Sequence, residues 1–321
     1  MRSRKNTVAV ISHEEDIDGL ASATLLLRFY RESSIILTNY HKMKWVHAVR
    51  KVHDLCRSYK NLELFISDLN LKPWMLEKLD KGLEECSEKK VYWIDHHVWD
   101  EESLRLAEKL GYVKTYGDRE HTSTELVARF LGVHDEVVEI LSELSRDSDY
   151  GLFKNPLTEP LTDLIRYIVY IMKRKSKLLK IVRKFSRGII WDSSMDFTWE
   201  SAIRYKARAL EKARENLFQT EIKGCKILFI FSDPILSSKI LLERIGVGIE
   251  YDIAFTIYSN GSITISRKNN LIDCSSIARR LGGGGHVYIA GAQISSRIVR
   301  DRDRVLREIL SKIQEAIPRC R

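Results

Sequence analysis

The chain has 321 residues, 44% of them hydrophobic, which is enough for two globular domains with buried cores. No run approaches the roughly 20 apolar residues of a membrane-spanning helix, and we expect neither a membrane segment nor a signal peptide. The formal net charge of +9 fits an anionic partner such as nucleic acid, but it also fits an ordinary surface rich in Lys, Arg and Glu.

The first half of the chain alternates short β-rich runs with helical patterns, which predicts an α/β domain with a mostly parallel sheet and helices on both faces. Strands are expected at Val8–Ser12, Ile35–Leu37, Leu62–Ser67 and Val91–Ile94, and helices at Leu20–Tyr30, His47–Tyr59, from Pro73, Leu126–Phe130 and Val137–Ser145. The helix at His47–Tyr59 has a basic face. Ligands bind beyond the carboxyl ends of the strands in such sheets, and three of these strands end in acidic or histidine-bearing loops.

A different pattern follows from Pro156. The segment is helical and strongly basic, with no acidic residue between Asp163 and Asp192. We expect a catalytic domain over residues 1–155, a basic helical connector over 156–220 and a smaller α/β domain over 221–321. The last domain is predicted from strands at Lys226–Phe231, Tyr251–Tyr258, Ser262–Arg267 and Ile289–Ser295, helices at Ser237–Ile245, Ser275–Leu281 and 301–316, and a hairpin turn at Asn260-Gly261.

The five cysteines are widely separated and form no CxxC pair. A zinc cage is therefore not expected, and the pattern gives no support for a disulfide framework. We expect a reducing, cytoplasmic setting.

Carboxylates and imidazoles gather at the predicted strand ends. The loop after the first strand offers His13, Asp16 and Asp18, and Gly19 lets the backbone turn into the next helix. An acidic loop that only caps a helix would have the same composition. The other candidates are Asp68 after the strand that ends at Ser67, the tripeptide Asp95-His96-His97 after the strand that ends at Ile94, and Asp147 or Asp149 after a helix.

Together these residues supply enough ligands for two metal ions. Two ions can activate a water molecule in line with a phosphorus atom and stabilise the leaving oxygen. The sequence therefore predicts metal-assisted hydrolysis of a phosphate ester, with Asp95 orienting one of the adjacent histidines.

The C-terminal domain offers a candidate anion site. Four glycines at 282–285 precede His286, and glycine lets backbone N–H groups approach an anion closely. Arg267, at the end of a hairpin strand, could bind the same phosphate. A flexible loop and an exposed strand-end charge are the alternatives for these features.

The motifs resemble those of the DHH phosphoesterase superfamily, named for the tripeptide found here at 95–97. The first motif is matched by His13–Gly19, the second by Phe65–Asn70, the fourth by Asp149–Phe153 or by Asp147, and the C-terminal DHH-associated domain by Ile272–His286 followed by Ala290-Gly291. The C-terminal motif resembles the one found in the branch of the superfamily that contains RecJ-type nucleases, nanoRNases and pAp phosphatases.

The resemblance implies two manganese ions, with Mg²⁺ or Co²⁺ as substitutes. One ion would be held by His13, Asp16 and Asp68, and the other by Asp18, Asp68, His96 and Asp149 or Asp147. His97 would contact the phosphate with Asp95 supporting it, and Arg267, Gly283, Gly284, Gly285 and His286 would hold the terminal nucleotide.

The resemblance also implies a metal-dependent phosphodiesterase or exonuclease acting on single-stranded DNA or RNA, or on short oligonucleotides, from an end. The basic connector would guide such a strand. Two alternatives stay open: a phosphatase for a small substrate such as pAp or a dinucleotide, and a non-catalytic scaffold. The filled ligand positions argue against the scaffold, and the oligomeric state is left open.

Overall fold

The computed structural model describes residues 6–59 and 61–320. The chain divides into two compact units, Met1–Trp199 and Glu200–Arg321, with the boundary inside the long helix α9 (Ser193–Arg214). Much of the segment 156–220 is thus grouped with the first unit. Within the described residues, no helix combines the length and apolarity needed to cross a membrane.

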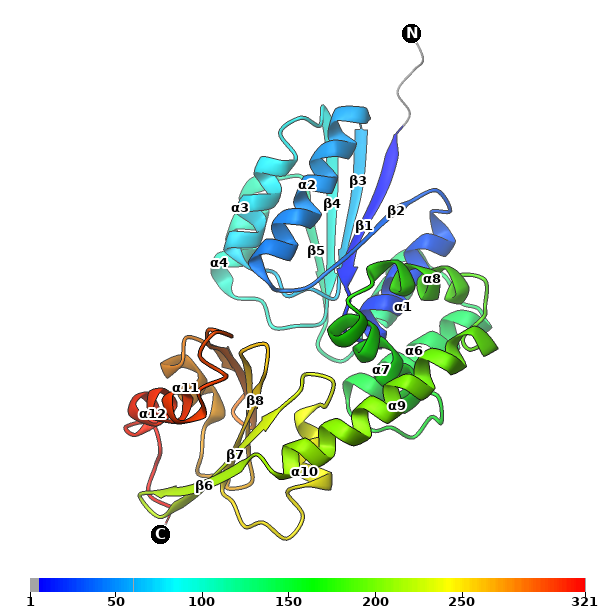
Figure 1. Ribbon diagram of the computed structural model, residues 1–321. Coiled ribbons are helices and arrows are strands. Elements are labelled where there is room, and N and C mark those ends of the chain that lie inside the picture. The colour runs from blue at the N-terminus through cyan, green and yellow to red at the C-terminus, as the bar shows by residue number, and fades with distance from the viewer. Residues whose placement is uncertain (1–5, 60, 321) are drawn as a thin grey trace. The chain divides into compact units, whose positions relative to one another are not determined.

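The first unit is built on a five-stranded, fully parallel sheet with the strand order β2-β1-β3-β4-β5 (Figure 1). The strands are β1 (Thr7–His13), β2 (Ser34–Thr38), β3 (Asn61–Ser67), β4 (Glu88–Asp95) and β5 (Val113–Gly117). The first four confirm the predicted strands. Strand β5 was not predicted because it is an edge strand whose residues after Val113 are exposed, so its sequence lacks an alternating apolar pattern.

Helices cover both faces of this sheet, as predicted (Figure 1). One face carries α2 (Lys42–Ser58), α3 (Pro73–Gly82) and α4 (Glu101–Leu110). The other carries α1 (Ile17–Phe29), α5 (Ser123–Leu131), α6 (Glu136–Asp149), α7 (Thr158–Arg166) and α8 (Lys175–Phe185), with a π-helix at Tyr167–Met172 between the last two. Alternate strand residues enter the two cores: Val10 packs with the second group of helices and Ile11 with the first.

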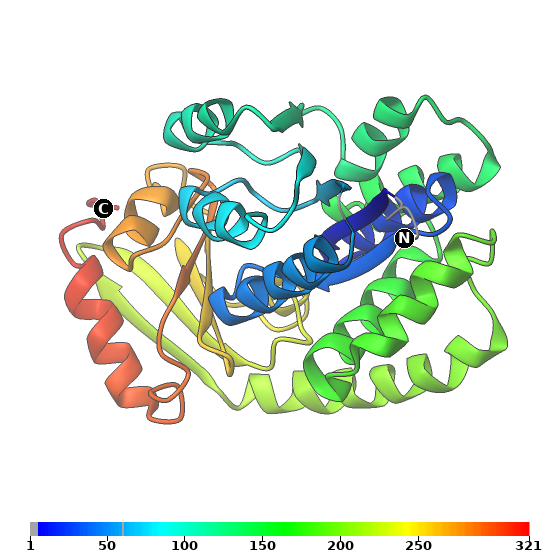
Figure 2. The ribbon, with the colours of Figure 1, turned by 90° about the horizontal axis from the view of Figure 1, so that it is seen from above.

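The second unit contains a six-stranded mixed sheet with the order β10-β11-β9-β8-β7-β6. Its strands are β6 (Leu217–Ile222), β7 (Cys225–Ser232), β8 (Ile253–Tyr258), β9 (Ser262–Arg267), β10 (Gly284–Gly285) and β11 (Ile289–Gln293), and its helices are α10 (Ser238–Arg244), α11 (Cys274–Arg280) and α12 (Arg302–Ile313). Side chains of α11 and α12 share one core with the sheet, and α12 runs beside the strands (Figure 2). The predicted Asn260-Gly261 hairpin joins β8 to β9, with Gly261 at φ 88°.

The basic helix α8 is less free than its sequence indicated. Lys175 forms an ion pair with Glu14, and Lys184 forms one with Asp192. Lys177 donates a hydrogen bond to Thr198. Part of the positive charge expected to guide a polyanion therefore stabilises the first unit itself.

Two disulfides are present, although the spacing of the cysteines gave no support for a disulfide framework. Cys56 in α2 pairs with Cys86, and Cys225 at the start of β7 pairs with Cys320, with Cα–Cα distances of 4.6 and 4.9 Å. The partners are 30 and 95 residues apart in sequence, so their spacing shows no motif. Among the described cysteines, Cys274 is free and buried.

Candidate metal centre

The loop between β1 and α1 turns tightly at the carboxyl edge of the sheet. Asp16 caps α1 by accepting a 3.0 Å hydrogen bond from the backbone N–H of Gly19. A Cβ atom at position 19 would lie 2.3 Å from the carbonyl oxygen of His13, so only glycine permits this turn. The turn brings His13 and Asp16 together.

His13, Asp16 and Asp68 form the first ligand group. Nδ1 of His13 lies 2.8 Å from Oδ2 of Asp16 and 3.5 Å from Oδ2 of Asp68. Asp68 follows β3 with φ of 55°, a left-handed conformation that aspartate tolerates better than most residues and that is often found at functional sites. The group therefore joins the ends of β1 and β3.

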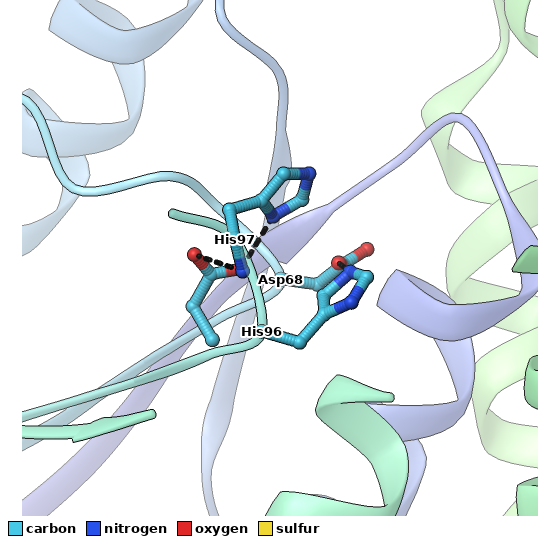
Figure 3. A group of neighbouring side chains, drawn as sticks. Asp68, His96 and His97 are labelled. Atoms are coloured by element: carbon cyan, nitrogen blue, oxygen red, sulfur yellow. Dashed lines mark hydrogen bonds and ion pairs between the residues drawn. The ribbon is translucent and has the colours of Figure 1, made fainter. Parts of the chain in front are cut away.

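His96 is at the centre of the second ligand group. Its Nε2 atom lies 3.3 Å from Oδ2 of Asp149, 3.5 Å from Oδ1 of Asp68 and 3.9 Å from Oδ2 of Asp18. Figure 3 shows His96 beside Asp68, with the ring of His97 leaving the same loop in another direction. Asp68 thus takes part in both groups, through different oxygens.

Asp95 holds His97 in place. Oδ1 of Asp95 lies 2.7 Å from Nδ1 of His97, and Oδ2 accepts hydrogen bonds from the His97 backbone N–H and from Nε1 of Trp99. Although burial opposes its ionisation, the His97 hydrogen bond holds the pKa of Asp95 below its usual range. Asp95 is fully buried, whereas the His97 side chain is 39% exposed and can meet a ligand.

Sequence reasoning missed the role of the α5 N-terminus. The backbone N–H groups of Ser123 and Thr124 each donate a 2.8 Å hydrogen bond to Asp18, and the Thr124 hydroxyl donates a third of 2.6 Å. The Ser123 hydroxyl also donates to Asp68, at 3.2 Å. The capping-box pattern from Thr122 to Glu125 marked this helix start. It did not show that the N–H groups at this helix start orient Asp18 and that the Ser123 hydroxyl contacts Asp68.

The two candidates for the fourth motif lie in different surroundings. Asp149 is beside His96. Asp147 accepts hydrogen bonds from the backbone of Lys154 and Asn155 and from the hydroxyl of Thr158. Asp147 therefore holds the loop that follows α6, and Asp149 is the one that lies in the cluster.

Two carboxylates of the cluster, Asp18 and Asp149, hold their protons more tightly than ordinary aspartates. Burial, followed by repulsion from Asp68, raises the pKa of Asp18 to about 7. Burial and the charges of Asp18 and Asp68 raise the pKa of Asp149 to about 9. Burial disfavours protonated His96, but its hydrogen bond to Asp68 and the charges of Asp149 and Asp18 raise its pKa to about 10. The cluster is therefore a strongly acidic environment that favours added positive charge.

The donor set fits divalent metal ions. Three groups of residues each place ligand atoms within 4.8 Å of one another: His13, Asp16 and Asp68; Asp18, His96 and Asp149; and Asp68, Asp95, His96 and His97. Oδ2 of Asp68 and Nε2 of His13 are buried without a hydrogen-bond partner among the described residues. Carboxylate oxygens with imidazole nitrogens suit Mn²⁺ and related ions.

The glycines at 283–285, candidate substrate residues of the second unit, lie close to the backbone of β11. Gly284 and Gly285 pair with Gly291 and Ala290, and a Cβ atom at Gly283 would lie 2.0 Å from the Gly291 carbonyl oxygen. These glycines therefore allow two segments to approach closely. The expected loop is partly a short strand.

His286 and Arg267, the other two candidates of this unit, differ in their contacts. The ring of exposed His286 stacks on Tyr288 with 5.5 Å between centroids. Nη1 of Arg267 donates hydrogen bonds to the carbonyl oxygens of Asn270 and Ile272, so part of its guanidinium holds the adjacent turn.

Comparisons with known proteins address the fold and the C-terminal unit. Residues 237–318 match the DHHA1 domain family. No curated protein has a significant sequence match to the chain. Among solved structures, similar folds include a DHH domain from a protein described as a member of a ribosomal-protein family, with 12% identity, TM-score 0.64, and coverage of 98% of this chain and 88% of that one.

Two further structures carry functional names. Exonuclease RecJ bound to manganese has 14% identity and TM-score 0.53, covering 99% of this chain and 92% of that one. The pGpG-specific phosphodiesterase PggH from Vibrio cholerae has 11% identity and TM-score 0.53, covering 97% and 100%. The chain therefore shares its fold with these structures. Its C-terminal unit carries a DHHA1 domain, as the sequence motifs predicted.

Proposed function

We propose that this protein is a divalent-metal-dependent phosphodiesterase that degrades single-stranded nucleic acid or short oligonucleotides from an end. The observation that carries this proposal is the position of Asp68, which belongs to a His13–Asp16 group through one oxygen and to a His96 group through the other. A carboxylate shared in this way is the arrangement that a two-metal phosphoesterase needs. The similar fold of a manganese-bound exonuclease supports the same chemistry.

The ligands follow from the two groups. One ion would be held by His13, Asp16 and Asp68, and the other by Asp18, Asp68, His96 and Asp149. Mn²⁺ is the expected metal, with Mg²⁺ or Co²⁺ as substitutes. Bound ions of this kind supply Lewis-acid activation of the phosphate and of the attacking water.

His97 is the residue we assign to the substrate phosphate. Its Nδ1 atom is held by Asp95, so Nε2 is the ring atom left for a ligand. Burial lowers the pKa of His97, but the hydrogen bond and charge of Asp95 raise it above its ordinary value overall. The imidazolium that results can donate from Nε2 to a phosphate oxygen or to the leaving oxygen.

Exposed cations along a helix that begins beside the centre favour a polymer as the substrate. Helix α2 begins at the carboxyl edge of the sheet and carries Lys42, Arg50, Lys51 and Arg57 on its exposed side. None of these four forms an ion pair with a described carboxylate. Such a row of cations supports binding of a phosphodiester backbone. Gly283, Gly284, Gly285, His286 and Arg267 remain our candidates for holding the terminal nucleotide.

A time course with end-labelled DNA and RNA, from dinucleotide to about 20-mer, tests the proposal in Mn²⁺, Mg²⁺ and EDTA. We expect stepwise shortening with metal and none with EDTA. His96→Ala and Asp68→Ala should abolish cleavage. His134→Ala is the matched control, because this side chain is 81% exposed and its ion pair within residues 6–59 and 61–320 is with Glu139 at the surface.

The substrate series also separates the alternatives. Hydrolysis of a dinucleotide or pAp without any cleavage of longer strands would replace the exonuclease with a small-substrate phosphoesterase. Absence of cleavage under every metal condition would contradict the phosphoesterase and favour a binding role.

A further inference from the structure

Tyr40 lies between the two ends of the candidate metal centre, at a position that the sequence motifs do not mark. It follows β2, two residues beyond Thr38. Its ring centroid is 5.5 Å from that of His13 and 6.4 Å from that of His97. It therefore contacts both a candidate metal ligand and the residue assigned to the phosphate.

A hydrogen bond holds the Tyr40 phenol in position beside the centre. Its oxygen accepts a 2.9 Å hydrogen bond from the backbone N–H of Asn70, in the loop that follows Asp68. Within the described part of the chain, no group accepts a hydrogen bond from the Tyr40 hydroxyl. An O–H whose oxygen already accepts a hydrogen bond is a stronger donor, so this hydroxyl has an unused proton at the edge of an anion site.

The phenol is a neutral donor. A tyrosine hydroxyl keeps its proton at neutral pH because its ordinary pKa is about 10. At the same time the residue is 39% exposed, so a ligand can reach it. A neutral hydroxyl can therefore face a phosphate without adding negative charge to a site already rich in carboxylates.

We propose that Tyr40 is a substrate-contacting residue, whose hydroxyl donates a hydrogen bond to a non-bridging oxygen of the phosphate beside His97. This inference rests on the proposed phosphoesterase function. The Tyr40 ring lies beside both His13 and His97. A phosphate that contacts His97 and an ion held by His13 would therefore lie next to the Tyr40 ring. A donor at this point would stabilise the charge that develops on the phosphate during hydrolysis.

Tyr40→Phe is the direct test, since it removes one oxygen and leaves the ring. The Asn70 N–H that loses its acceptor is exposed and can bind water instead, so stability should change little. Tyr112→Phe is the matched control, because its hydroxyl bonds to Asp80 at 2.5 Å, near the start of β5 rather than at the carboxyl edge of the sheet.

The full-length wild type and both variants would be compared by kcat on a short oligonucleotide, by calorimetric titration with Mn²⁺, and by the affinity of the Mn²⁺-loaded protein for inorganic phosphate. We expect Tyr40→Phe to lower kcat by about 10- to 100-fold and to weaken phosphate binding, with Mn²⁺ affinity and melting temperature unchanged. Tyr112→Phe should keep the wild-type kcat and phosphate affinity.

Wild-type kcat and phosphate affinity in Tyr40→Phe would overturn the inference while leaving the phosphoesterase intact. A loss of Mn²⁺ affinity that accounts for the loss of kcat would also overturn it, since Tyr40 would then only support His13. If the wild type cleaves nothing, the proposed function fails, and the phosphate titration alone decides whether Tyr40 binds this anion.

Discussion

Lys175 of α8 forms a 2.8 Å ion pair with Glu14, a carboxylate that is 2% exposed and adjacent to His13 in the candidate metal loop. Lys44 of α2 pairs with the other oxygen of Glu14, at 2.6 Å. Helices from the two faces of the sheet thus meet on one buried charge. The Glu14 side chain anchors the loop to α8 and α2, while the adjacent His13 faces the centre.

Lys175→Met is expected to destabilise the first unit by about 1–3 kcal/mol, because it leaves the buried Glu14 with Lys44 as its remaining cation. Urea denaturation with and without Mn²⁺ measures the change. The double variant Glu14→Gln/Lys175→Met should recover part of the loss, since no unpaired charge is then buried. Equal stability of Lys175→Met and wild type would show that the ion pair contributes nothing.

Asp149→Asn and Asp147→Asn should have opposite effects. Asp149→Asn removes a carboxylate that is repelled by its neighbours, so the metal-free protein should keep its stability while Mn²⁺ affinity falls at least about 10-fold. Asp147→Asn weakens the bonds to Lys154, Asn155 and Thr158, so stability should fall by about 1–2 kcal/mol with the metal affinity largely kept. Calorimetric metal titration and thermal melting of both variants provide the comparison. The reverse pattern would reassign the fourth-motif ligand to Asp147.

Metal binding should strengthen as the pH rises. The pKa values of about 7 for Asp18, 9 for Asp149 and 10 for His96 mean that these groups carry protons in the metal-free protein near neutral pH. A metal ion must displace those protons, so its apparent affinity increases from pH 6 to pH 9 and binding releases protons. Calorimetry in buffers of different ionisation enthalpy counts the released protons. A constant affinity across this range would contradict the protonated cluster.

The same shifts predict how the stability of the metal-free protein depends on pH. Each of these folded-state pKa values lies above the value for the unfolded chain. Their contribution is therefore complete below about pH 4, the ordinary pKa of aspartate. It decreases as the pH rises through the interval from about 4 to about 10, where the folded protein holds protons that the unfolded chain has lost. In EDTA, the melting temperature should fall over that interval, and Mn²⁺ should reduce or remove the fall.

Charge on α2 should matter for long substrates only. In the triple variant Lys42→Gln/Arg50→Gln/Arg57→Gln, we expect KM for a 20-mer to rise while dinucleotide hydrolysis is unchanged. The slope of log KM against log salt concentration should fall by about 2, since each single-strand phosphate contact contributes roughly 0.7. The variant Lys78→Gln/Lys81→Gln/Lys109→Gln removes the same charge from α3 and α4. An equal effect of both triples would mean that net charge, and not this helix, attracts the strand.

The helices and strands were predictable where the hydrophobic pattern of the sequence was strong. The candidate site was predictable where a candidate ligand lies at the carboxyl end of a strand. Asp68 and His96 could be found because parallel strands place their carboxyl ends at one edge. Ser123 and Thr124 were missed because their backbone N–H groups and hydroxyls meet Asp18 and Asp68 only through contacts that span more than 50 residues of sequence. Tyr40 was missed because its role depends on a loop that only the tertiary structure brings beside His97.

The cysteine pairs illustrate a different limit. Residues 30 and 95 positions apart come together through packing that no local pattern encodes. The bond between Cys225 and Cys320 makes nearly the whole second unit a closed covalent ring, which encloses the DHHA1 match. A protease that cuts once inside this ring would yield two fragments that migrate as one species on a gel until a reductant is added. The two pieces of a cleaved second unit would therefore stay joined by the disulfide. A single cut in an exposed loop would not release the last strand or helix of the domain.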